Sequence, residues 1–253
     1  MAPKAIIVTG ASRGIGLAVA LYLLNASHKV VLVSRSEEQL KGLKGKFPSQ
    51  VEYIAADLTN VNVAAEVTKL AIKSFGKIDG VVINHGVLHP MTRIEKSSID
   101  EWKELFDANL FSALALAKET IPHLRTSKGR IIFTSSGAAK HAYTSWGAYG
   151  ASKAALNSLV QHIGVEEPDI VAVALNPGRT DTDMQKDIRE TGAPGIAMSE
   201  ADHANFKEVF EKGGLNKPEW PGHVIAKLSL DAKPEFSGKV IPWNAPELAE
   251  YRE

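Results

Sequence analysis

Short runs rich in Val and Ile alternate along this chain with stretches of helical periodicity, and this alternation constrains the fold more than any other feature. The strand-like runs are apolar on both faces, which is typical of parallel strands buried between layers of helices. They are Lys4–Thr9, Lys29–Val33, Val51–Ala55, Ile78–Asn84, Arg130–Ser135, Ile170–Asn176 and Gly238–Ile241. The helical stretches are Gly14–Asn25, Ser36–Lys46, Val61–Phe75, Ser98–Thr126 and Trp146–Gly164. With right-handed crossovers, this order predicts an α/β fold: a doubly wound, Rossmann-type parallel sheet of about seven strands with helices on both faces.

The 253 residues suit one domain with a substantial core, and we expect residues 1–253 to form a single domain. Only residues 182–222 break the rhythm. This segment holds Gly192, Pro194, Gly195, Gly213, Gly214, Pro218 and Pro221 among short helical pieces. A long insertion late in the sheet predicts a substrate lid. Ile196, Met198, Phe206 and Phe210 would close over a substrate, although packing explains their helical spacing equally well.

The first strand ends in a glycine-rich turn that leads into a helix. The turn reads Thr9-Gly10-Ala11-Ser12-Arg13-Gly14-Ile15-Gly16, so its glycines have the spacing G-x-x-x-G-x-G. Glycine lets the backbone turn tightly and approach a pyrophosphate, which binds at the free N–H groups of a helix N-terminus. The turn therefore predicts a dinucleotide site, the alternative being a plain glycine-rich connection.

The second strand leads into Ser34 and Arg35, where an NAD-specific site would carry an Asp or Glu for the ribose 2′-hydroxyl. A guanidinium can hold a 2′-phosphate by two hydrogen bonds, and a hydroxyl can add a third. Arg13 projects from the neighbouring glycine turn. These residues favour NADP(H) over NAD(H). The alternative is that Arg35 is an ordinary solvated arginine at a helix start.

Polar residues also follow the third and fourth strands, at the edge of the sheet where ligands bind. Asp57 could accept a hydrogen bond from an adenine amino group beside Leu58, or it could cap the next helix. The fourth strand closes with Asn84, His85 and Gly86, and the glycine would let the backbone come close to a ribose. We expect His85 to be structural, because a single unpaired histidine at a strand end is more often structural than catalytic.

Tyr149 and Lys153 are four residues apart on a predicted helix, so their side chains lie on one face, one turn apart. An ammonium near a phenol favours the phenolate and lowers the pKa of the phenol from its ordinary value near 10. We therefore expect Tyr149 to act as an acid or base near neutral pH. The hydroxyl of Ser136 could orient a carbonyl oxygen beside it.

Together and in this order, these motifs resemble those of the short-chain dehydrogenase/reductase family of the single-domain type, over nearly the whole chain. The resemblance implies that Tyr149 is the general acid for carbonyl reduction and the base for alcohol oxidation. Lys153 would bind the nicotinamide ribose and lower the pKa of the tyrosine, and Ser136 would hold the substrate oxygen. Asn109 would sit in a helix bend and anchor a water that links Lys153 to solvent, the alternative being a polar residue on an amphipathic helix.

The resemblance extends to the segment after the sixth strand. It implies that Pro177 and Gly178 lie against the nicotinamide, that Thr182 bonds its carboxamide and that Thr180 also contacts the cofactor. The short connection near residues 166–169 and the string PGRTDTDMQ resemble the benzil reductase and sepiapterin reductase-like members, fungal ones included. His85 departs from the family, which usually has Asn or Ala there, and we expect the change to be tolerated because backbone makes that contact.

The implied activity is NADPH-dependent reduction of a ketone, diketone or aldehyde to an alcohol by reversible hydride transfer. Two alternatives stay open: an NAD-dependent alcohol or polyol dehydrogenase, and a non-catalytic NADP(H)-binding regulator, a kind of protein that usually loses the tyrosine or the lysine. Residues near the catalytic set that could line a substrate pocket are Ala138, His141, Trp146 and Met184. Trp146 could equally be a packing residue. If Trp146 and Met184 line the pocket, the substrate is apolar or aromatic.

Composition excludes several other classes of protein. The chain has 29 basic residues (Lys and Arg) and 29 acidic residues (Asp and Glu), so its net charge is zero. A zero net charge argues against binding to nucleic acids or to anionic membranes. Cysteine is absent and the histidines are scattered, so we expect no metal site. No apolar run is long enough to cross a membrane, and no signal or transit peptide is evident, which suits a cytoplasmic location.

The family resemblance also implies a homodimer or homotetramer, because the helices near Ser98–Thr126 and Trp146–Gly164 commonly pair between subunits. The residues of one apolar stripe that could take part are Leu110, Leu114, Ala117 and Ile121. The same stripe could instead face only the sheet.

Overall fold

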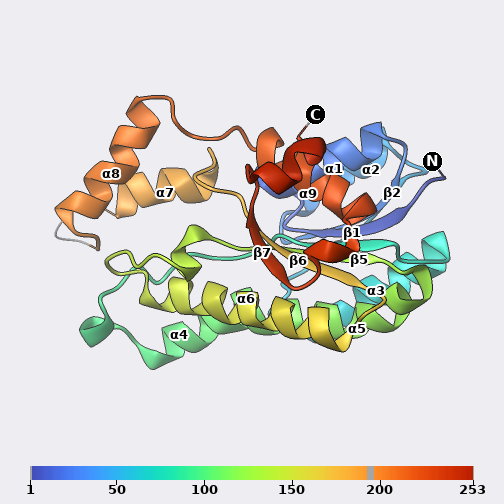
Figure 1. Cartoon of the computed structure of the whole chain (residues 1–253), viewed down its shortest axis with the longest axis horizontal. Coiled ribbons are helices and arrows are strands. Elements are labelled where there is room, and N and C mark those ends of the chain that lie inside the picture. The colour runs from blue at the N-terminus through green and yellow to red at the C-terminus, as the bar shows by residue number, and fades with distance from the viewer. Residues whose placement is uncertain (1, 193–196, 253) are drawn as a thin grey trace.

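A computed structural model describes residues 2–192 and 197–252 of the chain. In these residues seven parallel strands form one sheet, in the order β3-β2-β1-β4-β5-β6-β7 (Figure 1). The strands are β1 (Ala5–Thr9), β2 (Lys29–Ser34), β3 (Val51–Ala55), β4 (Gly80–Ile83), β5 (Arg130–Thr134), β6 (Val171–Asn176) and β7 (Lys239–Pro242). The predicted doubly wound parallel sheet is confirmed.

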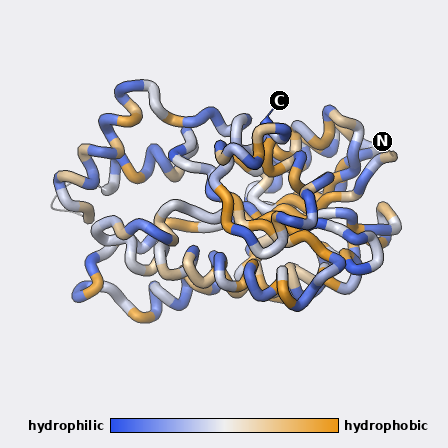
Figure 2. The backbone as a smooth tube through the Cα atoms, viewed as in Figure 1, coloured by the Kyte–Doolittle hydropathy of each residue, from blue (hydrophilic) through white to orange (hydrophobic). Residues whose placement is uncertain are grey.

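Helices cover both faces of the sheet (Figure 1). One face carries α1 (Gly14–Asn25), α2 (Glu37–Lys46) and α9 (Glu219–Asp231); the other carries α3 (Asn62–Phe75), α5 (Ser112–Ser127) and α6 (Gly147–Glu166), with α4 (Ile99–Phe106) against α6. Consecutive residues of β2 serve different layers, because Leu32 packs in the cluster with α1 and α9 whereas Val31 packs in the cluster with α3, α5 and α6. The strands are accordingly hydrophobic along their length (Figure 2).

The strand order reverses at β1, which pairs with β2 on one side and with β4 on the other. Crossovers to opposite faces leave a crevice at the carboxyl ends of such strands. The turns that follow β1, β4, β5 and β6 converge there, and they carry most of the residues that sequence reasoning singled out.

The helix predicted over Ser98–Thr126 is divided into α4 and α5 by a π-helical turn at Asp107–Phe111. A π-helical turn holds one residue more than an α-helical turn, and such turns often occur at functional sites. Here the turn carries Asn109, whose side chain is almost completely buried. The expected bend at Asn109 is therefore a π-helical turn inside an otherwise continuous helix.

Beyond β6 the chain forms α7 (Asp183–Thr191) and α8 (Glu200–Glu211), which project past the carboxyl edge of the sheet (Figure 1). The predicted end of the lid is wrong: residues 219–222 form the first turn of α9, which packs on α1. A Cβ on Gly222 would lie 2.8 Å from the Cβ of Ala18. Sequence reasoning missed α9 because Pro221 and Gly222 disfavour a helix interior, although proline is tolerated in a first turn. Pro194, Gly195 and Ile196 lie outside the described residues.

The apolar stripe predicted for pairing between subunits lies on α5 and on the π-helical turn before it. Leu110, Ala117 and Ile121 pack into the core on the α5 side of the sheet, whereas Leu114 is exposed. The predicted apolar stripe therefore faces mainly the sheet.

Among the described residues, no helix combines the length and the apolar character that a membrane span requires.

Candidate active site

The glycine turn after β1 has the backbone geometry of a close-approach site. Gly10 and Gly14 have positive φ angles of 63° and 54°, which side chains other than glycine rarely adopt. A Cβ on Gly16 would lie 2.2 Å from the carbonyl oxygen of Gly10, so the turn can form only with glycine there. The helix α1 begins at Gly14, and the free N–H groups of a helix N-terminus are suited to binding an anion.

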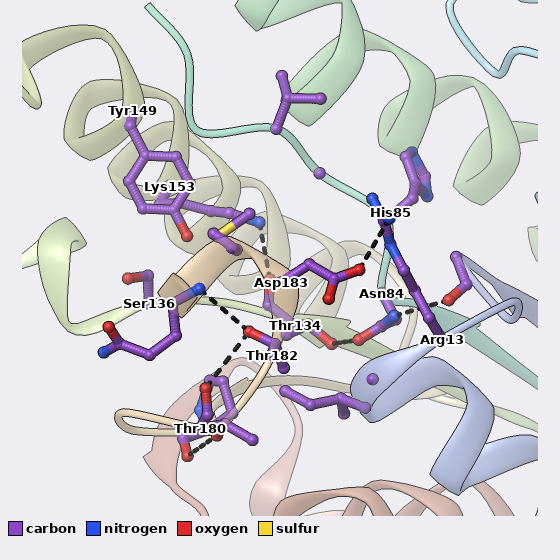
Figure 3. A pocket seen from close by; sticks show the side chains of 18 of the residues that line it. Arg13, Asn84, His85, Thr134, Ser136, Tyr149, Lys153, Thr180, Thr182 and Asp183 are labelled. Carbon is purple, nitrogen blue, oxygen red and sulfur yellow. Dashed lines mark hydrogen bonds and ion pairs between the residues drawn. The ribbon is translucent and has the colours of Figure 1, made fainter. Parts of the chain in front are cut away.

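Three side chains from β5 and α6 converge in the cavity (Figure 3). Ser136 follows β5 and caps a short 3-10 helix by accepting a hydrogen bond from the backbone N–H of Ala138. Tyr149 and Lys153 lie one turn apart on α6, and both are buried, at 6% and 4% exposed. The Nζ of Lys153 donates to the carbonyl oxygen of Thr134 at 2.9 Å.

Burial dominates the acid–base properties of this trio. It raises the pKa of the Tyr149 phenol above its ordinary value, and hydrogen bonding with Ser136 partly opposes the rise. Burial also lowers the pKa of Lys153 to about 8. The expected lowering of the Tyr149 pKa is thus wrong for the protein without ligand. The physical reason is that desolvation of the phenolate outweighs the ammonium, whose Nζ lies 5.9 Å from the ring centroid and is engaged by Thr134.

Asn109 connects the π-helical turn to the segment after β4. Its Oδ1 accepts from the backbone N–H of Val87 at 2.7 Å, and its Nδ2 donates to the carbonyl oxygen of Val87 at 2.8 Å and to Ser152 Oγ at 3.1 Å. A Cβ on Gly86 would lie 3.2 Å from Asn109 Oδ1 and 3.4 Å from Lys153 Nζ. The absence of a side chain at residue 86 therefore keeps the wall of the cavity next to the lysine open.

His85 bridges the first strand and the helix α5. Its Nδ1 lies 2.7 Å from Thr9 Oγ1, and its Nε2 lies 2.7 Å from Ser112 Oγ, which donates onward to the carbonyl oxygen of Ala108. Because Ser112 donates to Ala108, it accepts from Nε2–H, and Nδ1 accepts from Thr9. Burial and the charge of Lys153 lower the pKa of His85 to about 3, so the imidazole is neutral. These contacts agree with the structural interpretation of His85.

Two further turns, which carry Asn84 and Asp57, line the cavity beside the glycine turn. Asn84 receives a hydrogen bond from Thr134 Oγ1 at 3.1 Å and donates to the carbonyl oxygen of Gly10 at 3.4 Å, joining three strand ends. The carboxylate of Asp57 accepts from the backbone N–H and the hydroxyl of Thr59, both at 2.9 Å, and these bonds lower its pKa. Asp57 therefore stabilises its own turn and does not cap α3, which begins at residue 62.

The segment after β6 lines another side of the cavity. Thr180 Oγ1 donates to the carbonyl oxygen of Pro177 at 3.1 Å, and Thr182 caps α7 by accepting from the backbone N–H of Gln185. Asp183 forms an ion pair with Arg13 at 2.9 Å (Figure 3). Sequence reasoning missed this contact between the glycine turn and α7, because no local pattern links residues so far apart in the chain.

The cavity measures about 720 Å³ and brings nearly all predicted site residues together. From the cofactor set it is lined by Gly10, Ser12, Arg13, Gly14, Ile15, Ser34, Arg35, Asp57, Leu58, Asn84, Gly86, Pro177, Gly178, Thr180 and Thr182, and from the catalytic and pocket sets by Ser136, Tyr149, Lys153, Ala138, His141, Trp146 and Met184. Gly16 and Asn109 do not line it, but each contacts residues that do.

An aromatic cluster lines the cavity beside Tyr149. Trp146 packs edge-on against Tyr149 with the ring centroids 5.7 Å apart, and it contacts the rings of Tyr143 at 4.9 Å and Phe206 at 5.2 Å. Sequence reasoning named Phe206 as a lid residue but missed Tyr143, which follows the short 3-10 helix and has no periodic signal. Among the described residues, no group of three or more His, Cys, Asp or Glu side chains could hold a metal ion.

The sequence and the structure of this chain are similar to those of known proteins. A family model described as short chain dehydrogenase matches residues 4–193. An uncharacterized oxidoreductase of Schizosaccharomyces pombe is 42% identical over 96% of this chain and 98% of its own length. A Saccharomyces cerevisiae protein named benzil reductase ((S)-benzoin forming) is 36% identical over 97% of each chain. The crystal structure of a short chain dehydrogenase/reductase from Saccharomyces cerevisiae has a TM-score of 0.95 and 38% identity, and covers 99% of this chain and 100% of that one.

Proposed function

The chain belongs to the short-chain dehydrogenase/reductase family, and we propose that it reduces a ketone, diketone or aldehyde to the alcohol with NADPH, using Tyr149 as the general acid. The observation that carries this proposal is the convergence of Tyr149, Ser136 and Lys153 in one cavity with the glycine turn. An acid, an orienting hydroxyl and a buried ammonium in one cavity with a dinucleotide turn are the groups that hydride transfer to a bound carbonyl requires.

Each side chain of the trio has a distinct part in the proposed reaction. The raised pKa of Tyr149 keeps the phenol protonated at neutral pH, so it can give its proton to a carbonyl oxygen that gains negative charge. Ser136 lines the same cavity as the phenol and can donate to the same oxygen. The ammonium of Lys153 can stabilise the phenolate left after proton transfer, and a bound nicotinamide would supply the hydride.

The residues of the cavity fit a nicotinamide dinucleotide phosphate. The Gly10–Gly16 turn offers N–H groups to a pyrophosphate, and the crowding around Gly16 shows that the turn is built without side chains. Ser34 and Arg35 line the cavity after β2, where no carboxylate stands. Within residues 2–192 and 197–252, the one ion pair of the Arg13 side chain is with Asp183, and both side chains are exposed. Such a pair contributes little to stability, so the guanidinium can exchange the carboxylate for a phosphate. These features support NADP(H) over NAD(H).

The test is turnover measured by loss of nicotinamide absorbance, with NADPH or NADH and a panel of aldehydes, ketones, 1,2-diketones, quinones and pterins. We expect NADPH-dependent turnover that falls roughly 10²- to 10⁴-fold in Tyr149→Phe, the usual worth of a general acid. NADPH binding by that variant should change little, because the ring is kept. Tyr143→Phe is the matched control, since it removes a phenol hydroxyl from the same cluster.

Other outcomes would select the alternatives. Full activity in Tyr149→Phe would refute the acid role. Tight NADPH binding without turnover on any carbonyl would favour a non-catalytic regulator, and a preference for NADH that survives loss of Arg35 would favour an NAD-dependent alcohol dehydrogenase.

The aromatic cluster and the relatives indicate the kind of substrate. Trp146, Tyr143 and Phe206 make the substrate end of the cavity apolar and aromatic, and one relative is named a benzil reductase. We therefore propose an aromatic ketone or diketone as substrate. We also propose that the protein is a cytoplasmic homodimer or homotetramer, which light scattering on purified protein and imaging of a tagged chain would test.

A further inference from the structure

Asp202 joins α8 to the segment that precedes α6. Its Oδ2 accepts from the backbone N–H of Thr144 at 2.9 Å and from the Thr144 hydroxyl at 2.6 Å. The same oxygen accepts from the hydroxyl of Ser199 at 2.9 Å, and Ser199 Oγ caps α8 by accepting from the backbone N–H of Asp202. One carboxylate oxygen therefore takes three hydrogen bonds, and two of them come from a residue 58 positions earlier in the chain.

A carboxylate is suited to this contact. Hydrogen bonds to an ionised acceptor are shorter and stronger than those between neutral groups. The hydrogen bonds from Thr144 hold the pKa of Asp202 below its ordinary value, so the side chain is ionised at neutral pH. Asp202 is also half-buried, and a hydrogen bond is stronger where water is excluded.

The backbone of the anchored segment is strained at the residue after Thr144. Ser145 has a φ of 70°, a left-handed conformation that residues other than glycine rarely adopt. Its carbonyl oxygen accepts from the backbone N–H of Thr92 at 3.1 Å, and its buried hydroxyl donates to the carbonyl oxygen of Ala197, just before α8. A strained conformation persists only where the surroundings impose it. Here two consecutive residues are held by Asp202 and Ala197, which supply that constraint.

The two anchored residues lie between two rings of the aromatic cluster. Tyr143 precedes them and Trp146 follows them. Phe206 lies one helical turn after Asp202 on α8, on the same face of the helix. The centroid of its ring is 5.2 Å from that of Trp146 and 5.4 Å from that of Tyr143, and all three residues line the cavity. The contact of Asp202 therefore fixes the ring that α8 supplies against the two rings that precede α6.

We propose that Asp202 is a positioning residue for substrate recognition: it holds Phe206 against Trp146, so that the aromatic cluster receives an aromatic group of the substrate. This inference rests on the proposed carbonyl reduction and names the residue that keeps the aromatic cluster together. Aromatic rings attract one another only at particular distances and orientations. A cluster that loosens therefore loses selectivity for an aromatic substrate more than it loses activity on a small one.

The first test compares two 1,2-diketones that differ in one group: methyl phenyl diketone carries a phenyl group where dimethyl diketone carries a methyl group. With NADPH, kcat and KM are measured on both for wild type and for Asp202→Ala. The ratio of kcat/KM for the aromatic diketone to kcat/KM for the aliphatic one should fall roughly fivefold in the variant, the usual worth of one pair of aromatic rings. The Kd for NADPH should not change. The different reactivity of the two diketones cancels between wild type and variant.

Three further variants separate the contact from its surroundings. Asp202→Asn keeps an oxygen that can accept from Thr144, so it should retain most of the wild-type ratio. Glu200→Ala removes an exposed carboxylate from the same turn of α8 and should leave the ratio unchanged. Thr144→Val removes the hydroxyl bond but keeps the bond from the backbone N–H, so it should lower the ratio by a smaller factor than Asp202→Ala.

The second test reports the position of Trp146 without turnover. The chain has four tryptophans, so protein labelled with fluorotryptophan gives four fluorine resonances, and the one from Trp146 is assigned by its absence in Trp146→Phe. Asp202→Ala should move this resonance, because the ring of Phe206 no longer packs at a fixed distance from the indole. Glu200→Ala should leave it in place.

The outcomes distinguish this inference from the proposed function. Equal loss of kcat/KM on both diketones in Asp202→Ala would overturn the inference and leave the reductase activity standing, and so would an unmoved Trp146 resonance. If Asp202→Ala does not fold, Thr144→Val decides by the same two measurements. Absence of turnover on any carbonyl by folded wild-type protein would refute the proposed function, and the role of Asp202 in substrate recognition with it.

Discussion

Replacing Lys153 by methionine should stabilise the protein in the absence of ligand, although it removes a residue of the proposed catalytic set. Burial lowers the pKa of Lys153 from an ordinary 10.5 to about 8, and one pKa unit corresponds to about 1.36 kcal/mol. Keeping this ammonium buried therefore costs ~3 kcal/mol at neutral pH. Methionine fills a similar volume without charge, but it loses the hydrogen bond to Thr134, worth ~1 kcal/mol. The expected net gain is ~2 kcal/mol.

The assay is thermal unfolding without cofactor, where a gain of this size raises Tm by roughly 4–8 °C for a chain of this length. Lys41→Met on the exposed face of α2 is the control and should change stability by less than ~0.5 kcal/mol. The same Lys153→Met variant should have little or no turnover.

The pH dependence gives a second, independent check. Because the folded pKa lies below the ordinary one, the unfolded chain binds more protons between pH 8 and 10.5, and wild-type stability rises with pH across this window. Lys153→Met lacks this rise, so its advantage should shrink as the pH increases from about 8. A variant less stable than wild type, or an advantage that does not change with pH, would refute the desolvation argument.

Three further predictions concern the cofactor, the buried histidine and the glycines. Arg35→Asp should shift the ratio of kcat/KM for NADPH and NADH toward NADH by roughly tenfold or more, and an unchanged ratio would remove Arg35 from the phosphate site. The pKa of His85 is lowered to about 3, so wild type should lose stability as the pH falls below about 6.5, and His85→Asn should lose less in acid denaturation curves. Gly42→Ala on α2, where a Cβ meets nothing within 4 Å, should add ~0.5–1 kcal/mol to the free energy of unfolding, whereas Gly16→Ala should disrupt NADPH binding. If Gly42→Ala and Gly16→Ala changed the free energy of unfolding equally in urea titration, the close-packing argument for Gly16 would be contradicted.

Local patterns predicted the fold well because the inner strands β1, β2, β4, β5 and β6 are buried on both faces. Val31 and Leu32 face different helical layers, so both must be apolar, and the resulting continuous runs are visible in the sequence. The strands that α9 packs against, β4 and β5, were predicted, but α9 itself was not, because its first turn contains Pro221 and Gly222. Only the contact of Gly222 with Ala18 shows why a residue without a side chain is needed there.

The sequence by itself determined the strand order along the chain, the glycine turn and the identities of Ser136, Tyr149 and Lys153, because these depend on residue type and on spacing within one strand, turn or helix. Tertiary structure alone decided the electrostatics and the distant contacts. The direction of the Tyr149 pKa depends on how completely the phenol is buried, and the ion pair of Arg13 with Asp183 joins segments far apart in the chain. The indole nitrogen of Trp146, which has no hydrogen-bond partner among the described residues, is likewise buried only when Tyr143 and Phe206 have packed around it, since desolvation is a property of the assembled neighbours and not of any one residue.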